Sequence, residues 1–392
     1  MSNDQLGRSD SAHAQDGQLK VLIAHEHFLP DYRGGGETVV YETARNLVQH
    51  NVDVRVLTTG NPRIEAYEGI ATKRLAIHPY LFNVAIPTFV RQARDVDLIH
   101  AFSYHAALPA LAVGRMLGKP VFCTMLGLFH DAWLHMRGPL VGRAFRRWER
   151  ILVSAPYDRT SFASEFARDI GVRCGAKDST SIVNNPGIAL DGFRSAPKKE
   201  DVVLFVGKFD ARKGIHDILS AASLLPEVRF QLIGWGHGEA TVRNARLPNV
   251  EVIVLPGGQS VRGGAAQDTL RGAYARARIF LFPSYAETFG LVLVEAMASG
   301  CAVVSSVPLE FAGIRVAAGD QQRLVEAVAT LWSDRAGTGA MGEENVRLSR
   351  QFTWSRYTHR LLASYRDVLG TTQLGSLACG ANCPACGAAQ DL

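Results

Sequence analysis

Short apolar runs alternate with longer amphipathic stretches along most of the chain. Such runs are typical of parallel strands buried on both faces, and the longer stretches indicate helices between them. In the first half, the pattern predicts strands at Val21–Ala24, Val54–Leu57, Leu98–His100, Val121–Thr124 and Ile151–Val153. In the second half, it predicts strands at Val202–Val206, Arg229–Ile233, Glu251–Val254, Ile279–Phe282 and Ala302–Ser305. This alternation predicts an α/β fold with parallel sheets.

The chain divides near Asn184–Lys199, where N-N-P-G and A-P-K-K-E have the composition of a turn and a linker. We therefore expect one domain over residues 19–190 and a second over residues 198–350, each with helices on both faces of its sheet. Parallel sheets bind ligands at the carboxyl ends of their strands. Two such domains facing each other would therefore hold a ligand in the cleft between them.

The amino-acid composition excludes only a few classes of function. The 392 residues carry a net charge of +5, which is mild, and we expect no nucleic acid partner. No apolar run approaches the roughly 18–20 residues of a membrane span. Residues 1–18 are polar and lack the apolar core of a signal peptide, so we expect a disordered tail and a cytoplasmic location.

The segment from Ile279 to Ser305 is the most informative part of the chain. It predicts a strand, a polar loop that contains Glu287, a helix that contains Glu295, and a second strand. The first turn of the helix has free backbone N–H groups and the positive end of the helix dipole, which suit a phosphate. Two carboxylates beside such an anion site suit a ligand with hydroxyls and phosphates. A nucleotide sugar is a ligand of this kind.

These residues resemble the signature of the retaining GT-B glycosyltransferases of family 4, also called glycosyl transferases group 1. The frame is F-P-S-x-x-E-x-F-G-x-x-x-x-E-A-M-A-x-G. The resemblance implies a GT-B fold, in which two Rossmann-like domains face each other across a cleft. It implies that Glu287 lies by the donor sugar, that Glu295 binds the ribose hydroxyls, and that the backbone of Phe289, Gly290 and Leu291 holds the diphosphate. A single glutamate would more simply be a helix cap or a solvated charge, but the whole frame favours a site.

A basic loop follows the strand Val202–Val206 and reads G-K-F-D-A-R-K-G. A departing diphosphate develops negative charge, which fixed cations stabilise without a metal ion. The resemblance gives this role to Lys208 and Lys213, so we expect no required cofactor and no metal, with the nucleotide sugar as co-substrate. The alternative is a solvated start of a helix, although a basic residue is unfavourable there.

Two glycine-rich turns are further candidates for contact with the donor. Gly234 and Gly236 follow the second predicted strand of the second domain, and Gly35 and Gly36 open the predicted helix Glu37–Gln49. The turn that contains Gly234 and Gly236 lacks the G-x-G-x-x-G spacing of a dinucleotide site. The resemblance implies that Gly234 and Gly236 pass beside the nucleoside, and that Gly35 and Gly36 approach the diphosphate or the acceptor. Either turn could instead be ordinary loop flexibility.

The acceptor side matches the family less well. Many members carry T-x-H-G after the fourth strand, whereas this chain has Thr124, Met125, Leu126 and Gly127, so that Leu126 stands where the histidine is expected. His130 and His105 are candidates to face the acceptor instead. A lone histidine is more often an ordinary loop or core residue.

Four arginines fall on one stripe of a predicted helix: Arg143, Arg146, Arg147 and Arg150. Basic residues near an anionic membrane surface contribute about 1 kcal/mol each. Many relatives use lipid-linked acceptors. We therefore expect a glycan or a lipid-linked molecule as the acceptor, and weigh contact with the inner face of the membrane against a merely solvated helix face.

The end of the chain carries two more predictions. Residues 354–369 resemble the terminal helix that crosses back to the N-terminal domain in GT-B enzymes. Residues 371–392 contain Cys379, Cys383 and Cys386 in C-x-x-x-C-x-x-C spacing. This spacing is typical of iron–sulfur loops and of part of a zinc knuckle. Three thiols fall short of the four ligands of a structural zinc, which favours a disordered tail.

The sequence therefore predicts a retaining glycosyltransferase that moves a sugar from a nucleoside diphosphate to a hydroxyl acceptor, in the assembly of a glycan, polysaccharide or glycolipid. Two alternatives stay open. One is another enzyme on the same architecture, such as a sugar-nucleotide epimerase or a phosphorylase. The other is a catalytically silent scaffold that binds nucleotide sugars, which would explain Leu126 but has no need of the two lysines.

Overall fold

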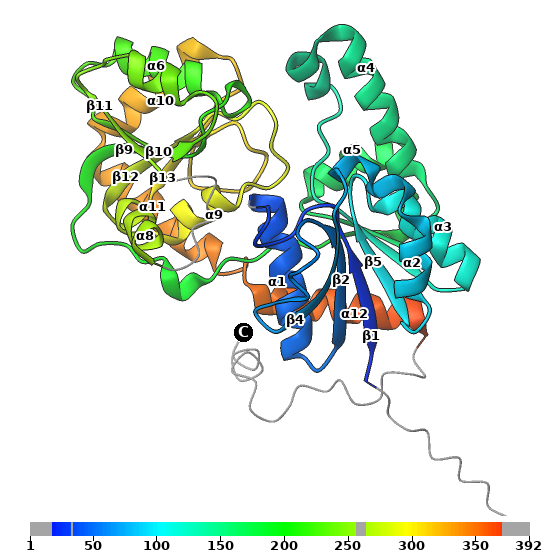
Figure 1. Cartoon of the computed structure of the whole chain (residues 1–392). Helices are drawn as coiled ribbons and strands as arrows, with labels where there is room; N and C mark the ends of the chain where they lie inside the picture. Colours follow the sequence, from blue (N-terminus) through cyan, green and yellow to red (C-terminus); the bar gives the residue numbers. More distant parts are fainter. Residues whose placement is uncertain (1–17, 33, 256–263, 371–392) are drawn as a thin grey trace, which may run out of the picture.

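The computed structural model describes residues 18–32, 34–255 and 264–370. Two α/β domains, each built around one sheet, lie side by side (Figure 1). The predicted fold class is confirmed. Both predicted tails, over residues 1–18 and 371–392, lie outside the described residues, with the exception of Gln18.

The N-terminal domain has an eight-stranded sheet in the order β3-β4-β2-β1-β5-β6-β7-β8. All neighbouring strands are parallel except β3 and β4. The strands are β1 Lys20–Ala24, β2 Asp53–Thr59, β3 Ala66–Tyr67, β4 Ile70–Leu75, β5 Leu98–Phe102, β6 Val121–Met125, β7 Arg159–Phe162 and β8 Ser181–Val183. Because β1 pairs with both β2 and β5, successive strands are added on one side of β1 up to β4 and on its other side from β5 onward. Parallel sheets bind ligands at such a switch point, at the carboxyl ends of the strands.

Five long helices belong to this domain: α1 Gly35–Gln49, α2 Ile86–Ala93, α3 Ala107–Leu117, α4 Ala132–Ser154 and α5 Glu165–Arg173. The N-cap of α1 is Gly34, so the predicted glycine loop does open this helix. Helix α4 is kinked at Gly138, which has a φ of 74°. Figure 1 shows α1 on the side that faces the C-terminal domain and α4 projecting beyond the sheet.

The C-terminal domain has a six-stranded parallel sheet in the order β11-β10-β9-β12-β13-β14. Its strands are β9 Glu200–Lys208, β10 Phe230–Trp235, β11 Val250–Val254, β12 Ala277–Phe282, β13 Ala302–Ser305 and β14 Gly313–Arg315. Its helices are α6 Ile215–Leu224, α7 Glu239–Asn244, α8 Gly264–Arg276, α9 Leu291–Ala298, α10 Gln321–Ser333 and α11 Arg335–Ser349. Strands β10 and β11 are added on one side of β9, and strands β12 to β14 on its other side. The loops after β9 and β12 therefore lie at the switch point of this second sheet.

The last helix, α12 Trp354–Leu369, packs on the N-terminal domain although it follows the C-terminal domain in the sequence (Figure 1). The hydroxyl of Tyr365 lies 2.6 Å from Nδ1 of buried His100, and the hydroxyl of Tyr357 lies 2.9 Å from that of Thr43. These contacts join the core of the N-terminal domain. The predicted crossing helix therefore occurs in the structure.

The predicted strand Ile151–Val153 is wrong, because these residues form the last turn of α4. A short apolar run does not distinguish a strand from a buried helix turn. Leu152 and Val153 are buried, while Ile151 is 46% exposed, as expected of a one-sided helix. The next strand is β7, which the sequence pattern missed together with β4 and the edge strands β3, β8 and β14.

Candidate functional site

The loop between β12 and α9 joins the two domains. The hydroxyl of Thr288 donates to the carbonyl oxygen of Leu126 at 3.2 Å, and the hydroxyl of Ser164 donates to the carbonyl oxygen of Thr288 at 2.6 Å. Thr288 and Ser164 are buried. Within the C-terminal domain, the N–H of Tyr285 donates to the carbonyl of Arg212 at 2.8 Å. The loop is thus fixed against both domains, and Leu126, where a histidine was expected, takes part through its backbone.

Glu287, in this loop, forms an ion pair with Lys213 from the loop after β9. The Lys213 side chain is largely buried, and its ammonium lies 5.1 Å from the centre of the Phe282 ring. Asp210 accepts from the N–H of Lys213 at 3.0 Å and so holds this turn. A buried ammonium needs a partner to offset its desolvation, and Glu287 supplies one. Two residues from separate predicted motifs therefore come together.

Lys208 stands apart from this ion pair. It ends β9, its side chain is exposed, and in the described part of the chain it makes no ion pair. It also does not line any of the cavities described below. Its predicted role at the diphosphate stays a prediction.

Glu295 lines a cavity of 370 Å³, the Glu295 cavity, which receives residues from both domains. The N-terminal domain contributes Gly34, Gly35 and Thr38 from the start of α1, and the C-terminal domain contributes Gly207, Trp235, Arg271 and Leu291. Its volume falls within the range of about 300–1,000 Å³ that is usual for small-molecule sites.

The carboxylate of Glu295 accepts a hydrogen bond from the hydroxyl of Tyr274 at 3.0 Å. Burial raises the pKa of Glu295 to about 7, although the hydrogen bond from Tyr274 and the positive charge of Arg271 act in the opposite direction. Nε of Arg271 is buried with no hydrogen-bond partner in the described structure. The cavity thus offers a carboxylate acceptor and a guanidinium donor to a ligand.

The start of α9 completes the wall of this cavity. Gly290 is its N-cap, has a φ of 82° and supplies no side-chain cap. The first N–H groups of a helix have no partner within the helix and attract anions. Leu291 lines the cavity, whereas Phe289 is buried against the ring of Phe352 at a centroid distance of 5.4 Å.

Of the four glycines predicted to contact the donor, only Gly35 lines the Glu295 cavity. Gly36 faces the side chain of Leu126. Gly234 and Gly236 do not line the cavity; Trp235 between them does. A Cβ at Gly234 would overlap the carbonyl oxygen of Gly207 on the neighbouring strand, so close packing of β9 on β10 already requires glycine there. Their contact with a nucleoside stays a prediction.

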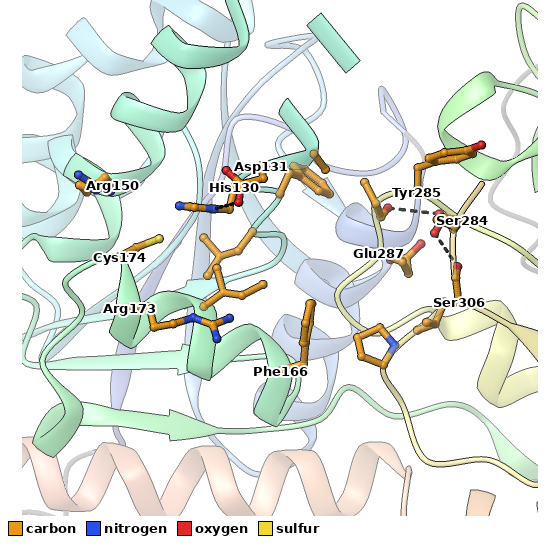
Figure 2. Close-up of a pocket in the computed structure, with 18 residues that line it drawn as sticks. His130, Asp131, Arg150, Phe166, Arg173, Cys174, Ser284, Tyr285, Glu287 and Ser306 are labelled. Atoms are coloured by element: carbon orange, nitrogen blue, oxygen red, sulfur yellow. Dashed lines mark hydrogen bonds and ion pairs between the residues drawn. The ribbon is translucent and has the colours of Figure 1, made fainter. Parts of the chain in front are cut away.

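A second cavity, of 540 Å³, lies beside Glu287 and is called the Glu287 cavity (Figure 2). Ser284, Tyr285, Glu287 and Ser306 form the wall that belongs to the C-terminal domain. The facing wall comes from the N-terminal domain: His130, Asp131, Arg150, Phe166, Arg173 and Cys174. The structure therefore brings predicted His130 opposite Glu287.

His130 is held by a buried carboxylate that the sequence analysis missed. Glu149, on α4, accepts from the N–H groups of Phe129 and His130 at 2.9 and 2.7 Å, from Nε1 of Trp133 at 3.2 Å and from the hydroxyl of Tyr104 at 2.6 Å. His130 has a φ of 38°, an uncommon conformation that these contacts fix. Glu149 thus shapes the wall that faces Glu287.

His105, the other predicted histidine, does not line the Glu287 cavity. Its Nδ1 lies 2.8 Å from the amide of Asn83, and its N–H donates to the carboxylate of Glu26 at 3.3 Å. Burial lowers the pKa of His105, and the charge of Glu26 acts against that shift.

Glu26 belongs to a polar group at the end of β1 that the sequence analysis also missed: His25, Glu26, His27 and Glu37. Nδ1 of His27 lies 3.4 Å from the carboxylate of Glu37, at the start of α1. Burial alone would raise the pKa of Glu37, but the hydrogen bond from His27 and the positive charge of His25 lower it to about 2. The run H-E-H directly after the first strand, at a switch point, was a usable signal.

A third cavity, of 730 Å³, adjoins the Glu287 cavity and shares Phe129 and Tyr285 with it. Trp133 and Met136 of α4 give it apolar surface, and His216 of α6 also lines it. We call it the Trp133 cavity.

The predicted arginine stripe is not uniform. Arg143, Arg147 and Arg150 are exposed, Arg146 pairs with Asp131 at 2.7 Å, and Arg150 also lines the Glu287 cavity. None of the helices in the described ranges has the length and apolar character needed to cross a bilayer. Over the same ranges, no cluster of three or more His, Cys, Asp or Glu side chains is arranged to hold a metal ion.

Comparison with known proteins assigns the family. Residues 33–191 match the model of "Glycosyltransferase Family 4", and residues 200–334 match that of "Glycosyl transferases group 1". A D-inositol 3-phosphate glycosyltransferase of Catenulispora acidiphila is 26% identical, over 86% of this chain and 91% of its own length.

Solved structures agree in fold. Sucrose-phosphate synthase of Thermosynechococcus elongatus superposes with a TM-score of 0.76 at 21% identity, over 91% of this chain and all of that one. The Anabaena protein HepE in complex with UDP-glucose gives a TM-score of 0.72 at 17% identity, over 89% of this chain and all of that one. With family models matched in both domains and the GT-B architecture present, the chain is a glycosyltransferase that belongs to family 4, the group 1 glycosyltransferases.

Proposed function

We propose that this glycosyltransferase moves a sugar from a nucleoside diphosphate to a hydroxyl acceptor with retention of the anomeric configuration. The observation that carries the proposal is the Glu295 cavity, in which a carboxylate and the N-terminus of α9 face the same space. A carboxylate accepts hydrogen bonds from ribose hydroxyls, and a helix N-terminus binds phosphate. UDP-glucose in the HepE complex supports a donor of this class.

The ion pair of Glu287 and Lys213 suggests where the sugar lies. Glu287 lines the second cavity, so a sugar bound beside it would present its anomeric carbon to an acceptor there. As the bond between that carbon and the diphosphate breaks, the Lys213 ammonium stabilises the charge that develops on the leaving oxygen. Lys208 adds a second cation if a ligand draws its exposed side chain inward.

Retention is proposed through substitution at the face that the diphosphate leaves. The acceptor oxygen forms the new bond to the anomeric carbon, and its proton passes to the departing phosphate oxygen. Lys213 already neutralises Glu287, which lowers its value as a nucleophile, and this supports the route without a glycosyl-enzyme bond. Because two lysines and a helix terminus serve the diphosphate, we propose that transfer needs no metal ion and no cofactor.

The acceptor side is wide enough for a large molecule. The Glu287 and Trp133 cavities adjoin, and the second offers apolar surface to a glycan or to a lipid-linked acceptor. The name of the Catenulispora relative points to a phosphorylated polyol as one acceptor of the family. Exposed Arg143 and Arg147 would suit an enzyme that works in the cytoplasm at the inner face of a membrane.

The first test is a panel of nucleotide sugars. We expect the correct donor and its free nucleoside diphosphate to raise the melting temperature, and transfer to a hydroxyl acceptor to persist in EDTA. The product anomer, determined by NMR, should match that of the donor. An inverted product would refute retention. Donor binding without transfer to any acceptor would favour a scaffold, and transfer only to or from inorganic phosphate would favour a phosphorylase.

A further inference from the structure

The Glu287 cavity has an excess of positive charge on one wall. Arg150, near the end of α4, and Arg173, in the last turn of α5, both line it. Across residues 18–32, 34–255 and 264–370, neither guanidinium takes part in an ion pair or a side-chain hydrogen bond. Figure 2 shows Arg173 on the wall that faces Glu287, with Arg150 and His130 on the same side.

The acidic side chains in and behind the walls of this cavity already have ion-pair or hydrogen-bond partners. Glu287 pairs with Lys213, and Asp131 pairs with Arg146 at 2.7 Å and with His130 at 3.1 Å. Glu149, behind the wall, is saturated by four donors. Arg150 and Arg173 are both exposed to solvent, and among the described residues neither has an acidic partner, so together they add a charge of +2 to this wall of the cavity.

Arg150 also differs from its neighbours on the helix. Arg143, Arg147 and Arg150 belong to the same stripe and are all exposed, but of these three only Arg150 lines the cavity. A uniformly solvated or membrane-facing stripe would not require one member to border the site. The end of a helix favours a cation, which would account for a basic residue at position 173, but not for its place opposite Glu287.

We propose that Arg150 and Arg173 form a subsite for a phosphate group of the acceptor, so that the enzyme glycosylates a hydroxyl of a phosphorylated molecule. Guanidinium groups bind phosphate through paired N–H donors. Partly exposed Phe166 and Ile170 also line this cavity and can pack against the carbon skeleton of the acceptor.

This inference rests on the proposed function, because it takes the Glu295 cavity and the start of α9 as the place of the donor diphosphate. That helix terminus and Lys213 belong to the C-terminal domain, whereas Arg150 and Arg173 line the facing wall. The two anionic groups therefore have separate binding places. An acceptor held by its phosphate would direct a hydroxyl across the cavity toward Glu287.

The test compares two double variants with the same change of charge. Arg150→Gln/Arg173→Gln removes the subsite, and Arg91→Gln/Arg94→Gln, two exposed arginines at the end of α2 that line none of the three cavities, is the control. Calorimetry with each phosphomonoester of a panel (D-inositol 3-phosphate, glucose 6-phosphate and glycerol 3-phosphate) and with its uncharged counterpart would be run with and without UDP. We expect at least one phosphorylated probe to bind the unmodified protein ten times more tightly than its counterpart. The subsite variant should lose this preference and the control should keep it.

A second arm identifies the source of the phosphate. Co-sedimentation with phosphatidylcholine vesicles, with and without phosphatidylinositol, would be measured for the same three proteins. If the headgroup of a lipid fills the subsite, the subsite variant should lose more vesicle binding than the control. If a soluble phosphate ester fills it, vesicle binding should be equal in the two variants while the calorimetric preference is lost only in the subsite variant.

The proposal is overturned if no phosphorylated probe or lipid is preferred by the unmodified protein, or if the control variant loses as much as the subsite variant. Failure of the proposed function looks different: UDP and nucleotide sugars would not bind. Because the acceptor probes are also measured without UDP, the two failures can be told apart. Equal melting temperatures of the two variants would exclude a general loss of folding.

Discussion

The loop between β12 and α9 lines the Glu287 cavity and α9 itself lines the Glu295 cavity, yet the two cavities are built differently. The Glu295 cavity has glycine backbone in its wall, Gly34 and Gly35 at the start of α1 and Gly207 near the end of β9, beside the side chains of Arg271 and Glu295. The Glu287 cavity is shaped by side chains that helices α4 and α5 supply. A backbone site suits a constant part of a ligand, and a side-chain site can differ between relatives. We therefore expect the first to serve the nucleotide and the second to choose the acceptor.

The largest expected effect concerns the ion pair of Glu287 and Lys213 beside the Glu287 cavity. Lys213→Met keeps the aliphatic stem over Phe282 but removes the charge that would stabilise the leaving diphosphate. Losing one such interaction in a transition state costs about 2.7–4 kcal/mol, so kcat should fall by about 10²–10³. Steady-state transfer assays measure this. Arg323→Met, on the exposed face of α10, is the control. Unchanged turnover in Lys213→Met would remove Lys213 from the mechanism.

A smaller and more selective effect is expected at Glu149. Glu149→Gln replaces a carboxylate that accepts four hydrogen bonds with an amide that cannot satisfy them all. A hydrogen bond to a charged group contributes about 1.5–3 kcal/mol. The efficiency kcat/KM for the acceptor should therefore fall about tenfold or more, while calorimetry should give the same affinity for UDP. Equal loss in both quantities would mean that Glu149 acts on the fold as a whole.

The two cavities should also differ in their dependence on pH. Burial raises the pKa of Glu295 to about 7, and only the ionised carboxylate can accept hydrogen bonds from both ribose hydroxyls. Below pH 7 the group is protonated, so UDP affinity should rise by up to about tenfold between pH 6 and pH 8. Titrations of Glu295→Gln should show weaker affinity and a smaller rise over this range, since only the terminal phosphate of UDP, with a pKa of about 6, still titrates there. A flat profile in the unmodified protein would contradict the assignment.

The smallest effects separate a glycine needed for folding from one that lines a ligand site. Gly234→Ala forces a Cβ against the carbonyl of Gly207, and overpacking of this kind costs about 1–3 kcal/mol of unfolding free energy. Gly35→Ala places its Cβ where no heavy atom lies within 4 Å. Urea denaturation should therefore show a loss for Gly234→Ala only, and calorimetry should show weaker UDP binding for Gly35→Ala.

The sequence predicted most of the fold, and it singled out Glu287 and Lys213, which the structure brings together, for a physical reason. Buried parallel strands are continuous apolar runs, and the site residues stand in loops directly after them, so Glu287 and Lys213 could be found although 74 positions separate them. The strand assigned to Ile151–Val153 failed because three apolar residues fit either a strand or a helix turn. Leu126, an apparent departure from the family, proved to bond Thr288 through its backbone.

The Glu287 cavity was harder to predict because its residues lie within helices. Glu149 occupies a helical position that would ordinarily be solvated, and only the packing of Tyr104, Phe129 and Trp133 around it shows that it is buried. Arg150 belongs to a regular stripe of arginines, and nothing in the sequence distinguishes it from Arg147. Side chains that act through tertiary contacts leave no local pattern.

The central claim is that the two glutamates serve different parts of one ligand, and one calorimetric comparison tests it most directly. UDP, or the nucleoside diphosphate that the panel selects, would be titrated into the unmodified protein, Glu295→Gln and Glu287→Gln, with sugar transfer measured in parallel. We expect Glu295→Gln to bind the diphosphate at least tenfold more weakly, as the loss of charged hydrogen bonds requires. Glu287→Gln should bind it almost normally but transfer sugar poorly. If both variants bind the diphosphate as the unmodified protein does, the account of the Glu295 cavity is wrong.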